Sequence, residues 1–237
     1  MTISDNTVVL VTGASRGIGR TLVETFLLRP KHTVIASVRE TAADYVKELE
    51  ALPKADGSRL QLVKIESSNS GDPAAAIKDL TDIDHIDVVV ANAGGAGENG
   101  IIPLDVVSPE IVTDVFTVNA LGPSALYQAV KPLLEKSQAP KWVSVTSAAG
   151  SIGRLEVYRA YIAPAYGIAK AGLNWITTSD AASFSIPWLG KESANSGRVV
   201  LSTAPTRTSS PLPHPGLVQT ESGNKSARAM GLPQAPN

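Results

Sequence analysis

The stretch "VTGASRGIG", residues 11–19, decides the predicted fold. An apolar run at residues 7–11 precedes its glycines, and residues 20–26 after them favour a helix. Gly13 permits a sharp turn, Gly17 lets the backbone approach a ligand, and Gly19 lets the helix pack closely on the strand. The free N–H groups at the start of that helix suit a pyrophosphate. We therefore predict a dinucleotide cradle. The spacing G-x-x-x-G-x-G differs from the commonest fingerprint, so an ordinary glycine-rich turn is the alternative.

The composition is that of one globular domain. The chain has 237 residues, 43% of them hydrophobic, and a net charge of -1, which gives no general attraction to nucleic acid or membranes. It has no cysteine and three scattered histidines, so we expect no disulfide and no metal site. Residues 1–6 lack the features of a signal peptide, and no segment has the length of a membrane span. We expect a cytoplasmic protein.

Short apolar runs alternate with segments of helical periodicity along the first 178 residues. This alternation is typical of a parallel sheet covered by helices on both faces. Pro73 and Pro109 each follow a capping residue type, which signals the start of a helix. We expect strands at 8–12, 33–37, 60–65, 86–91, 142–146 and 198–202, and helices near 17–28, 41–52, 73–80, 109–136 and 165–178.

The segment "YGIAK", residues 166–170, brings a phenol and an ammonium onto one face of a predicted helix. A phenol ionises at about pH 10 and is a poor proton donor at neutral pH, so we expect the charge of Lys170 to lower the pKa of Tyr166. Alone, Y-x-x-x-K is more often an exposed pair. Here it occurs with the glycine turn, with "NAG" at residues 92–94, and with Ser147 at the end of the fifth strand. That combination argues against chance coincidence.

These motifs, and the order in which they occur along the chain, resemble those of the short-chain dehydrogenase/reductase family. The resemblance covers residues 7–178 and returns at "HPGLVQT", residues 214–220, and it includes Asn119 in "VNALG". Through "VTGASRGIGR", "IDVVVANAG" and "ARAMGLPQAP", the chain looks most like fungal ketoreductases similar to norsolorinic acid ketoreductase. The resemblance implies an α/β fold of the Rossmann type, a doubly wound parallel sheet in the order 3-2-1-4-5-6 with helices on both faces.

The resemblance also implies the roles of the site residues in a carbonyl reductase. Hydride passes between a nicotinamide and a carbonyl carbon, while Tyr166 protonates the carbonyl oxygen and Ser147 donates a hydrogen bond to it. Lys170 binds the nicotinamide ribose, and Asn119 holds a water that relays protons. Each residue has an ordinary structural alternative, such as a bond from Asn119 to a neighbouring strand. The expected cofactor contacts are Gly13, Ser15, Arg16, Gly17, Ile18, Gly19, Arg39, Glu66, Asn92, Ala93, Gly94, Tyr166, Lys170, Pro215, Gly216, Val218 and Thr220.

The segment between Ser147 and Tyr166 departs from the family pattern. The two residues are 19 positions apart, several more than is usual in the family. We expect this segment beside the substrate, with an apolar pocket lined by Leu155, Tyr158, Tyr161 and Ile162. A surface loop held in place by its aromatic residues is the alternative. Ser151 is a second candidate for the serine role.

The charge at the end of the second strand favours NADP(H) over NAD(H). NAD-preferring relatives carry an acidic residue there, whereas this chain has Val38 followed by Arg39. Together with Arg16 in the glycine turn, two guanidinium groups suit a 2'-phosphate. The alternative is that both arginines are solvated surface charges. Glu66, after the third strand, is expected near the adenine.

Residues 179–213 do not follow the family. They are rich in Ser, Thr, Pro and Gly, and Pro187 would break a continuing helix. We expect an irregular segment before the P-G-x-V-x-T sequence of residues 214–237. It is either a genuine insertion or, as the favoured interpretation, a translated intron or faulty gene model. The single domain of residues 1–237 is then truncated, its last edge strand is missing, and the helix-mediated homo-oligomer usual in the family is doubtful.

Three functions are consistent with these residues. The leading one is an NADP-dependent reductase of a bulky apolar ketone, for example a polyketide intermediate. The second is a nucleotide-binding protein without activity, or an aberrantly spliced product, which would bind NADPH without turnover. The third is an extended-type epimerase or dehydratase of nucleotide sugars, which normally has a larger C-terminal domain than this chain can carry.

Overall fold

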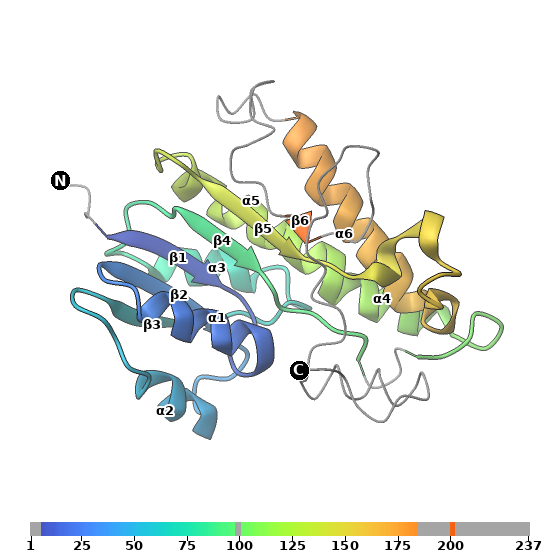
Figure 1. The fold of residues 1–237 in the computed structure, drawn as a ribbon, viewed down its shortest axis with the longest axis horizontal. Helices are drawn as coiled ribbons and strands as arrows, with labels where there is room; N and C mark the ends of the chain where they lie inside the picture. Colours follow the sequence, from blue (N-terminus) through green and yellow to red (C-terminus); the bar gives the residue numbers. More distant parts are fainter. Residues whose placement is uncertain (1–5, 98–100, 184–199, 202–237) are drawn as a thin grey trace.

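The computed structural model describes residues 6–97, 101–183 and 200–201, and its centre is a parallel sheet (Figure 1). Five strands run in the order β3-β2-β1-β4-β5, and the two-residue β6 pairs in parallel with β5. The predicted fold class and strand order are thereby confirmed. The strands are β1 (Thr7–Val11), β2 (His32–Val38), β3 (Arg59–Lys64), β4 (Val88–Ala91), β5 (Lys141–Val145) and β6 (Val200–Leu201).

Helices cover both faces of the sheet. One buried cluster joins the strands to α1 and α2, and a second joins them to α3 and α5. The described helices are α1 (Gly17–Leu27), α2 (Asp44–Glu50), α3 (Asp72–Asp79), α4 (Pro109–Phe116), α5 (Gly122–Leu134) and α6 (Pro164–Ser183). Within the described residues, none of these helices is long and apolar enough to cross a membrane.

The central strand β1 shows why the run at residues 7–11 is apolar throughout. Successive side chains of a strand point to opposite faces. Val8 and Leu10 pack in the cluster with α3 and α5, whereas Val9 and Val11 pack in the cluster with α1 and α2. A strand covered on both faces therefore needs apolar residues at consecutive positions.

The helix expected at 109–136 is interrupted. A π-helical turn, Thr117–Leu121, separates α4 from α5, and its last hydrogen bond runs from the Gly122 N–H to the Thr117 carbonyl. The physical reason lies in Pro123, which has no N–H to donate to the carbonyl oxygen of Asn119 four residues earlier. The widened turn carries Asn119, which is completely buried.

The expected end of the last helix at residue 178 is also wrong, because α6 continues to Ser183. The sequence Ser-Asp-Ala-Ala-Ser after Thr178 contains neither glycine nor proline, so nothing in it breaks a helix. The strand expected at 198–202 is represented by β6, Val200–Leu201. The expected irregular segment beyond α6, the P-G-x-V-x-T sequence and the missing edge strand lie outside the described residues.

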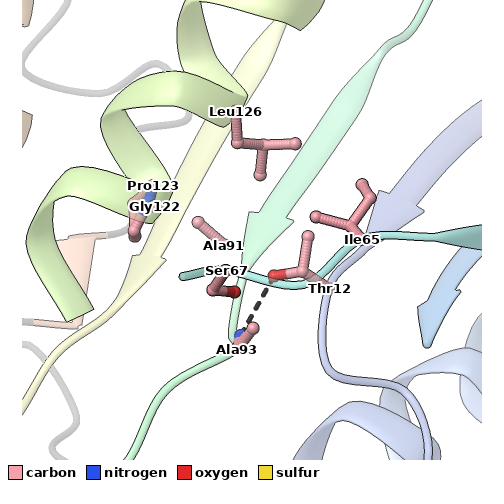
Figure 2. Close-up of a pocket in the computed structure, with 8 residues that line it drawn as sticks. All are labelled: Thr12, Ile65, Ser67, Ala91, Ala93, Gly122, Pro123 and Leu126. Atoms are coloured by element: carbon pink, nitrogen blue, oxygen red, sulfur yellow. Dashed lines mark hydrogen bonds between the residues drawn. The ribbon is translucent and has the colours of Figure 1, made fainter. Parts of the chain in front are cut away.

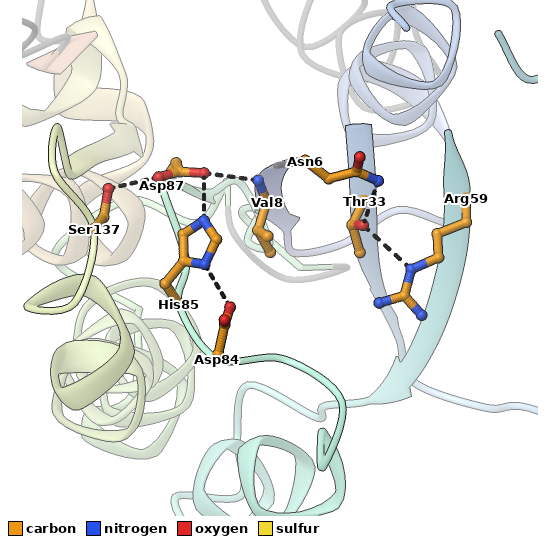
Figure 3. A network of polar contacts seen from close by, with 8 residues as sticks. All are labelled: Asn6, Val8, Thr33, Arg59, Asp84, His85, Asp87 and Ser137. Atoms are coloured by element: carbon orange, nitrogen blue, oxygen red, sulfur yellow. Dashed lines mark hydrogen bonds and ion pairs between the residues drawn. The ribbon is translucent and has the colours of Figure 1, made fainter. Parts of the chain in front are cut away.

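A polar network anchors the amino ends of β1 and β4, at the edge opposite the carboxyl ends of the strands (Figure 3). The Asp87 carboxylate accepts the N–H of Val8 at 2.8 Å and the hydroxyl of Ser137 at 2.6 Å. His85 lies between the carboxylates of Asp87 and Asp84, at 3.2 and 2.6 Å. Asp87 thus ties β1 to the chain segment that enters β5.

Candidate active site

The glycine turn has the backbone conformation that its sequence predicts. Gly13 and Gly17 have positive φ angles of +68° and +56°, which favour glycine. A Cβ at Gly19 would collide with the carbonyl oxygen of Gly13 and lie 2.6 Å from the amide nitrogen of Asn92. Helix α1 therefore starts directly against the end of β1. Ser15 and Ile18 are half-buried in the same turn.

Thr12, the last residue before the turn, ties the ends of β1 and β4 together. Its hydroxyl oxygen accepts hydrogen bonds from the backbone N–H groups of Asn92 and Ala93, both at 3.0 Å, and donates to the Val90 carbonyl at 3.4 Å. The side-chain amide of Asn92 donates in return to the carbonyl of Thr12 at 2.8 Å and, over a longer distance of 3.4 Å, to the carbonyl of Gly13. The "NAG" segment and the glycine turn are therefore one hydrogen-bonded unit.

The same unit encloses a small pocket at the carboxyl edge of the sheet (Figure 2). Its volume is about 10 Å³, close to the minimum for a single water molecule. It cannot hold a nucleotide or a ketone. Its lining comes from the ends of β1, β3 and β4 and the start of α5, namely Thr12, Ile65, Ser67, Ala91, Ala93, Gly122, Pro123 and Leu126.

Asn119 fastens the π-helical turn to the loop after β4. Its amide group donates to the carbonyls of Gly95 and Val115, both at 2.8 Å, and its oxygen accepts the N–H of Gly95 at 2.9 Å. Gly94, with a φ of +155°, passes so close that a Cβ there would lie 2.6 Å from the Asn119 oxygen and 3.4 Å from Lys170 Nζ. The side chain of Asn119 therefore brings the "NAG" loop beside Lys170.

Tyr166, Lys170 and Ser147 meet at the carboxyl end of β5. Tyr166 and Lys170 are one turn apart near the start of α6, and the Lys170 ammonium lies 5.6 Å from the centre of the Tyr166 ring. Ser147 follows β5, and its side chain lies close enough to the Tyr166 phenol to lower the pKa of Tyr166. Lys170 Nζ donates to the carbonyl of Val145 at 2.9 Å. The effect of Ser147 on the Tyr166 pKa favours Ser147 over Ser151 for the serine role.

The pKa values of the pair differ from the expectation. Burial raises the pKa of Tyr166, and Ser147 offsets part of this shift. Lys170 is 3% exposed, and burial lowers its pKa to about 8. The expected lowering of the Tyr166 pKa is therefore not found in this structure, because desolvation of the buried phenol has the larger effect.

A row of polar contacts joins α6 to β5 below the Tyr166–Lys170 pair. The Thr146 hydroxyl donates to the Asn174 oxygen at 2.6 Å, and the Asn174 amide donates to the Gly150 carbonyl at 3.4 Å. One turn further, the hydroxyls of Thr177 and Ser144 are hydrogen-bonded at 2.9 Å. These contacts set the position of the helix relative to the strand.

The charged residues predicted to contact the cofactor lie at the same edge of the sheet. Arg39 directly follows β2 and is exposed, and the exposed Arg16 is the residue directly before α1. Glu66 follows β3 and accepts a hydrogen bond from the Ser68 hydroxyl at 3.2 Å. Residues 215, 216, 218 and 220 lie outside the described residues. Among the described residues, no group of three or more potential metal ligands is present.

The long segment between Ser147 and Tyr166 forms short 3-10 turns that end at the start of α6 (Figure 1). It exposes four large apolar side chains at 39–82% of their surface: Ile152, Leu155, Val157 and Tyr161. Tyr158 and Ile162 are half-buried. The predicted apolar residues therefore lie in the segment that joins Ser147 to Tyr166, and most of them are exposed or half-buried.

Comparison with known proteins identifies the family. The short chain dehydrogenase family matches residues 7–185. The chain belongs to this family of oxidoreductases, as its fold and the order of its motifs predicted.

Its relatives include fungal enzymes. A short-chain dehydrogenase of Neurospora crassa is 42% identical over 98% of this chain and 84% of the relative. The norsolorinic acid ketoreductase of Aspergillus parasiticus is 36% identical over 98% of this chain and 78% of the relative. Among solved structures, an NADPH-bound carbonyl reductase from chicken fatty liver is 25% identical, with a TM-score of 0.66, over 78% of this chain and 71% of that one.

Two residues of the site were not singled out from the sequence. Thr12 is adjacent to Gly13 at the end of a strand, but a threonine there gives no sign that its hydroxyl will bind two N–H groups of another strand. Asn174 follows Tyr166 by eight positions and Lys170 by four, so helical spacing places all three on one face. That spacing is the signal that could have identified Asn174.

Proposed function

We propose that the protein is an NADP(H)-dependent carbonyl reductase that interconverts a ketone and its alcohol. The observation that carries this proposal is the meeting of Tyr166, Ser147 and Lys170 at one edge of the sheet, beside the glycine turn and the "NAG" loop. The edge where parallel strands end is where such folds bind their ligands.

The residues present fit a dinucleotide. The glycine turn leaves no room for a Cβ at Gly13 or Gly19, and it delivers the N-terminus of α1 to the edge of the sheet. Backbone N–H groups at a helix start bind phosphate oxygens. The residues that would hold the nucleotide here are the glycine turn, Asn92–Gly94 and Arg39. When bound, it supplies or accepts the hydride.

Tyr166 is the proposed general acid in the reducing direction. Its phenol is protonated at neutral pH because burial raises its pKa. It can therefore donate a proton to the carbonyl oxygen as negative charge develops there. The Ser147 hydroxyl, which lies beside Tyr166, can turn its one hydrogen to the same carbonyl oxygen and donate a hydrogen bond to it.

Lys170 and Asn119 are proposed to return the proton. With a pKa of about 8, Lys170 can exchange a proton with solvent near neutral pH. Since Pro123 cannot donate to the Asn119 carbonyl, that oxygen is suited to accept a hydrogen bond from a water molecule. Such a water would link Lys170 to solvent.

NADP(H) is proposed over NAD(H) because of charge. Arg39 follows β2 where an acidic residue would bind a ribose hydroxyl, and Arg16 lies in the glycine turn. Guanidinium groups suit a phosphate oxygen pair. We expect Arg39→Asp to raise the KM for NADPH at least tenfold and to leave that for NADH within about twofold. The exposed Arg29, at the other end of β2, provides a control of equal charge change as Arg29→Asp.

The proposed substrate is a bulky apolar ketone. The exposed apolar side chains of residues 152–161 adjoin the Ser147–Tyr166 pair, and apolar surface of that extent favours an apolar ligand. The norsolorinic acid ketoreductases among the relatives support a polyketide-type ketone as the substrate to test first.

The other functions have less support. The alignments with fungal relatives cover 98% of the chain and therefore run through 179–213, which argues against a translated intron. An intact Tyr166, Ser147 and Lys170 gives no reason for a nucleotide-binding protein without activity. We propose that residues 1–237 form one nucleotide-binding domain located in the cytoplasm. That the homo-oligomer usual in the family is doubtful stays a prediction.

The test is NADPH oxidation, followed by absorbance, over a panel of aliphatic, aromatic and polycyclic ketones. We expect activity in the parent and a loss of about 10²- to 10⁴-fold in Tyr166→Phe. Tyr127→Phe removes a phenol hydroxyl on α5 and should retain the parent's rate. If Tyr166→Phe keeps its activity, the proton-transfer role is wrong. NADPH binding without any turnover would favour the inactive nucleotide-binding protein.

A further inference from the structure

Asn174 holds the chain on both sides of Ser147. Its oxygen accepts the hydroxyl of Thr146, the residue directly before Ser147, at 2.6 Å. Its amide donates to the carbonyl of Gly150, three residues after Ser147, at 3.4 Å. Ser147 therefore lies between two residues, Thr146 and Gly150, that are both hydrogen-bonded to the same side chain of α6.

The turn after Ser147 packs directly on α6. A Cβ at Gly150 would lie 2.7 Å from the Lys170 carbonyl carbon and 2.9 Å from both Ala171 N and Asn174 Nδ2. The hydroxyl oxygen of Ser147 accepts a hydrogen bond from the N–H of Ala149 at 3.2 Å within this turn. Because the turn and the helix are in direct contact, the position of Asn174 along α6 determines where the Ser147 hydroxyl lies.

The same helix carries Tyr166 and Lys170 on the face of Asn174. Two further contacts join helix and strand, the Lys170 bond to Val145 above Asn174 and the Thr177 bond to Ser144 below it. Only the Asn174 contacts bracket Ser147.

We propose that Asn174 is a positioning residue that aligns the Ser147 hydroxyl with Tyr166 and with the carbonyl oxygen of the substrate. This inference rests on the proposed function. Asn174 does not touch the reacting atoms. It acts by fixing Thr146 and Gly150, so its loss misplaces the one hydrogen-bond donor that shares the substrate oxygen with Tyr166.

The test is a double-mutant cycle on kcat with Asn174→Ala and Ser147→Ala. We expect Ser147→Ala to lower kcat about 10²- to 10³-fold and Asn174→Ala about tenfold, with an unchanged Kd for NADPH. In the Ser147→Ala background, Asn174→Ala should lower kcat less than about twofold further, because the group it positions is already absent. Thr177→Val, one turn along the same helix, removes a buried hydroxyl contact and should change kcat less than about twofold.

A pH profile and a further variant distinguish positioning from a general structural role. Ser147 lowers the pKa of Tyr166. We therefore expect both Asn174→Ala and Ser147→Ala to move the alkaline limb of the pH–rate profile for reduction to higher pH. Thr177→Val should leave that limb unchanged. Lys170, the charged group beside Tyr166, is retained in every variant. Thr146→Val removes the partner of Asn174 from the strand side and should reproduce its effect, including where Asn174→Ala does not fold.

Two outcomes would overturn the inference. One is a full tenfold effect of Asn174→Ala in the Ser147→Ala background. The other is parent-like kcat in both Asn174→Ala and Thr146→Val. In either case the proposed function stands, provided that the parent reduces ketones and Tyr166→Phe does not. A parent without NADPH-dependent reduction would refute the proposed function itself.

Discussion

We expect Thr12→Val to destabilise the protein far more than Thr12→Ser does. The Thr12 hydroxyl oxygen is the acceptor for the backbone N–H groups of Asn92 and Ala93, both at 3.0 Å, and the residue is 3% exposed. Valine has nearly the same shape but cannot accept either bond. Serine keeps the acceptor and loses only a methyl group.

The magnitude follows from these two donors. A buried polar group that loses its partner costs about 1–3 kcal/mol. Asn92 and Ala93 are half-buried, so water can replace part of the loss. We therefore expect Thr12→Val to lower the free energy of unfolding by about 2–4 kcal/mol, and Thr12→Ser by about 1 kcal/mol.

The assay is urea unfolding followed by circular dichroism, with the Kd for NADPH measured on the same proteins. Because the two bonds join the glycine turn to the "NAG" loop, we also expect the Kd to rise in Thr12→Val and to change little in Thr12→Ser. If the two variants agree within about 0.5 kcal/mol, the hydroxyl does not organise this edge of the sheet and the reasoning is refuted.

Three further predictions concern other parts of the fold. Asp87→Asn should lower the unfolding free energy by about 1–2 kcal/mol, and Asp84→Asn, on the exposed side of His85, by less than half of that; equal losses in thermal unfolding would contradict this. The folded-state pKa of Lys170 lies below its unfolded value, so the unfolded chain binds more protons between about pH 8 and 10.5, and stability should rise with pH across that window in the parent relative to Lys170→Met. If urea titrations show that the difference in unfolding free energy between the parent and Lys170→Met does not change with pH, this would argue against a buried ammonium. Gly94→Ala should weaken NADPH binding at least tenfold more than Gly95→Ala, because both have extended positive φ angles but only the former places a Cβ 2.6 Å from Asn119; similar Kd values would show that the close approach is unimportant.

The sequence alone was sufficient for the sheet and for the turn that follows its first strand. Consecutive apolar residues in β1 predicted a strand buried on both faces, and the glycine spacing at residues 13–19 predicted the turn that follows it. These inferences succeed because the alternation of side chains along a strand and the preference of glycine for positive φ are properties of short stretches of chain. The one-turn spacing of Tyr166 and Lys170 succeeds for the same reason, since helical geometry is set within a few residues.

Other features were decided only by the tertiary structure. The break at Asn119 depends on Pro123 together with the packing around it. The sequence after Thr178 contains no residue that ends a helix, so the sequence did not specify that α6 ends at Ser183. The contacts of Thr12 with the end of β4 and of Asn174 with the turn after β5 join residues 24–81 positions apart in the chain. The shifted pKa of Tyr166 likewise reflects desolvation by segments remote in sequence. Hydrogen-bond partners and burial across such separations follow from how the elements pack, and no local pattern of residues specifies them.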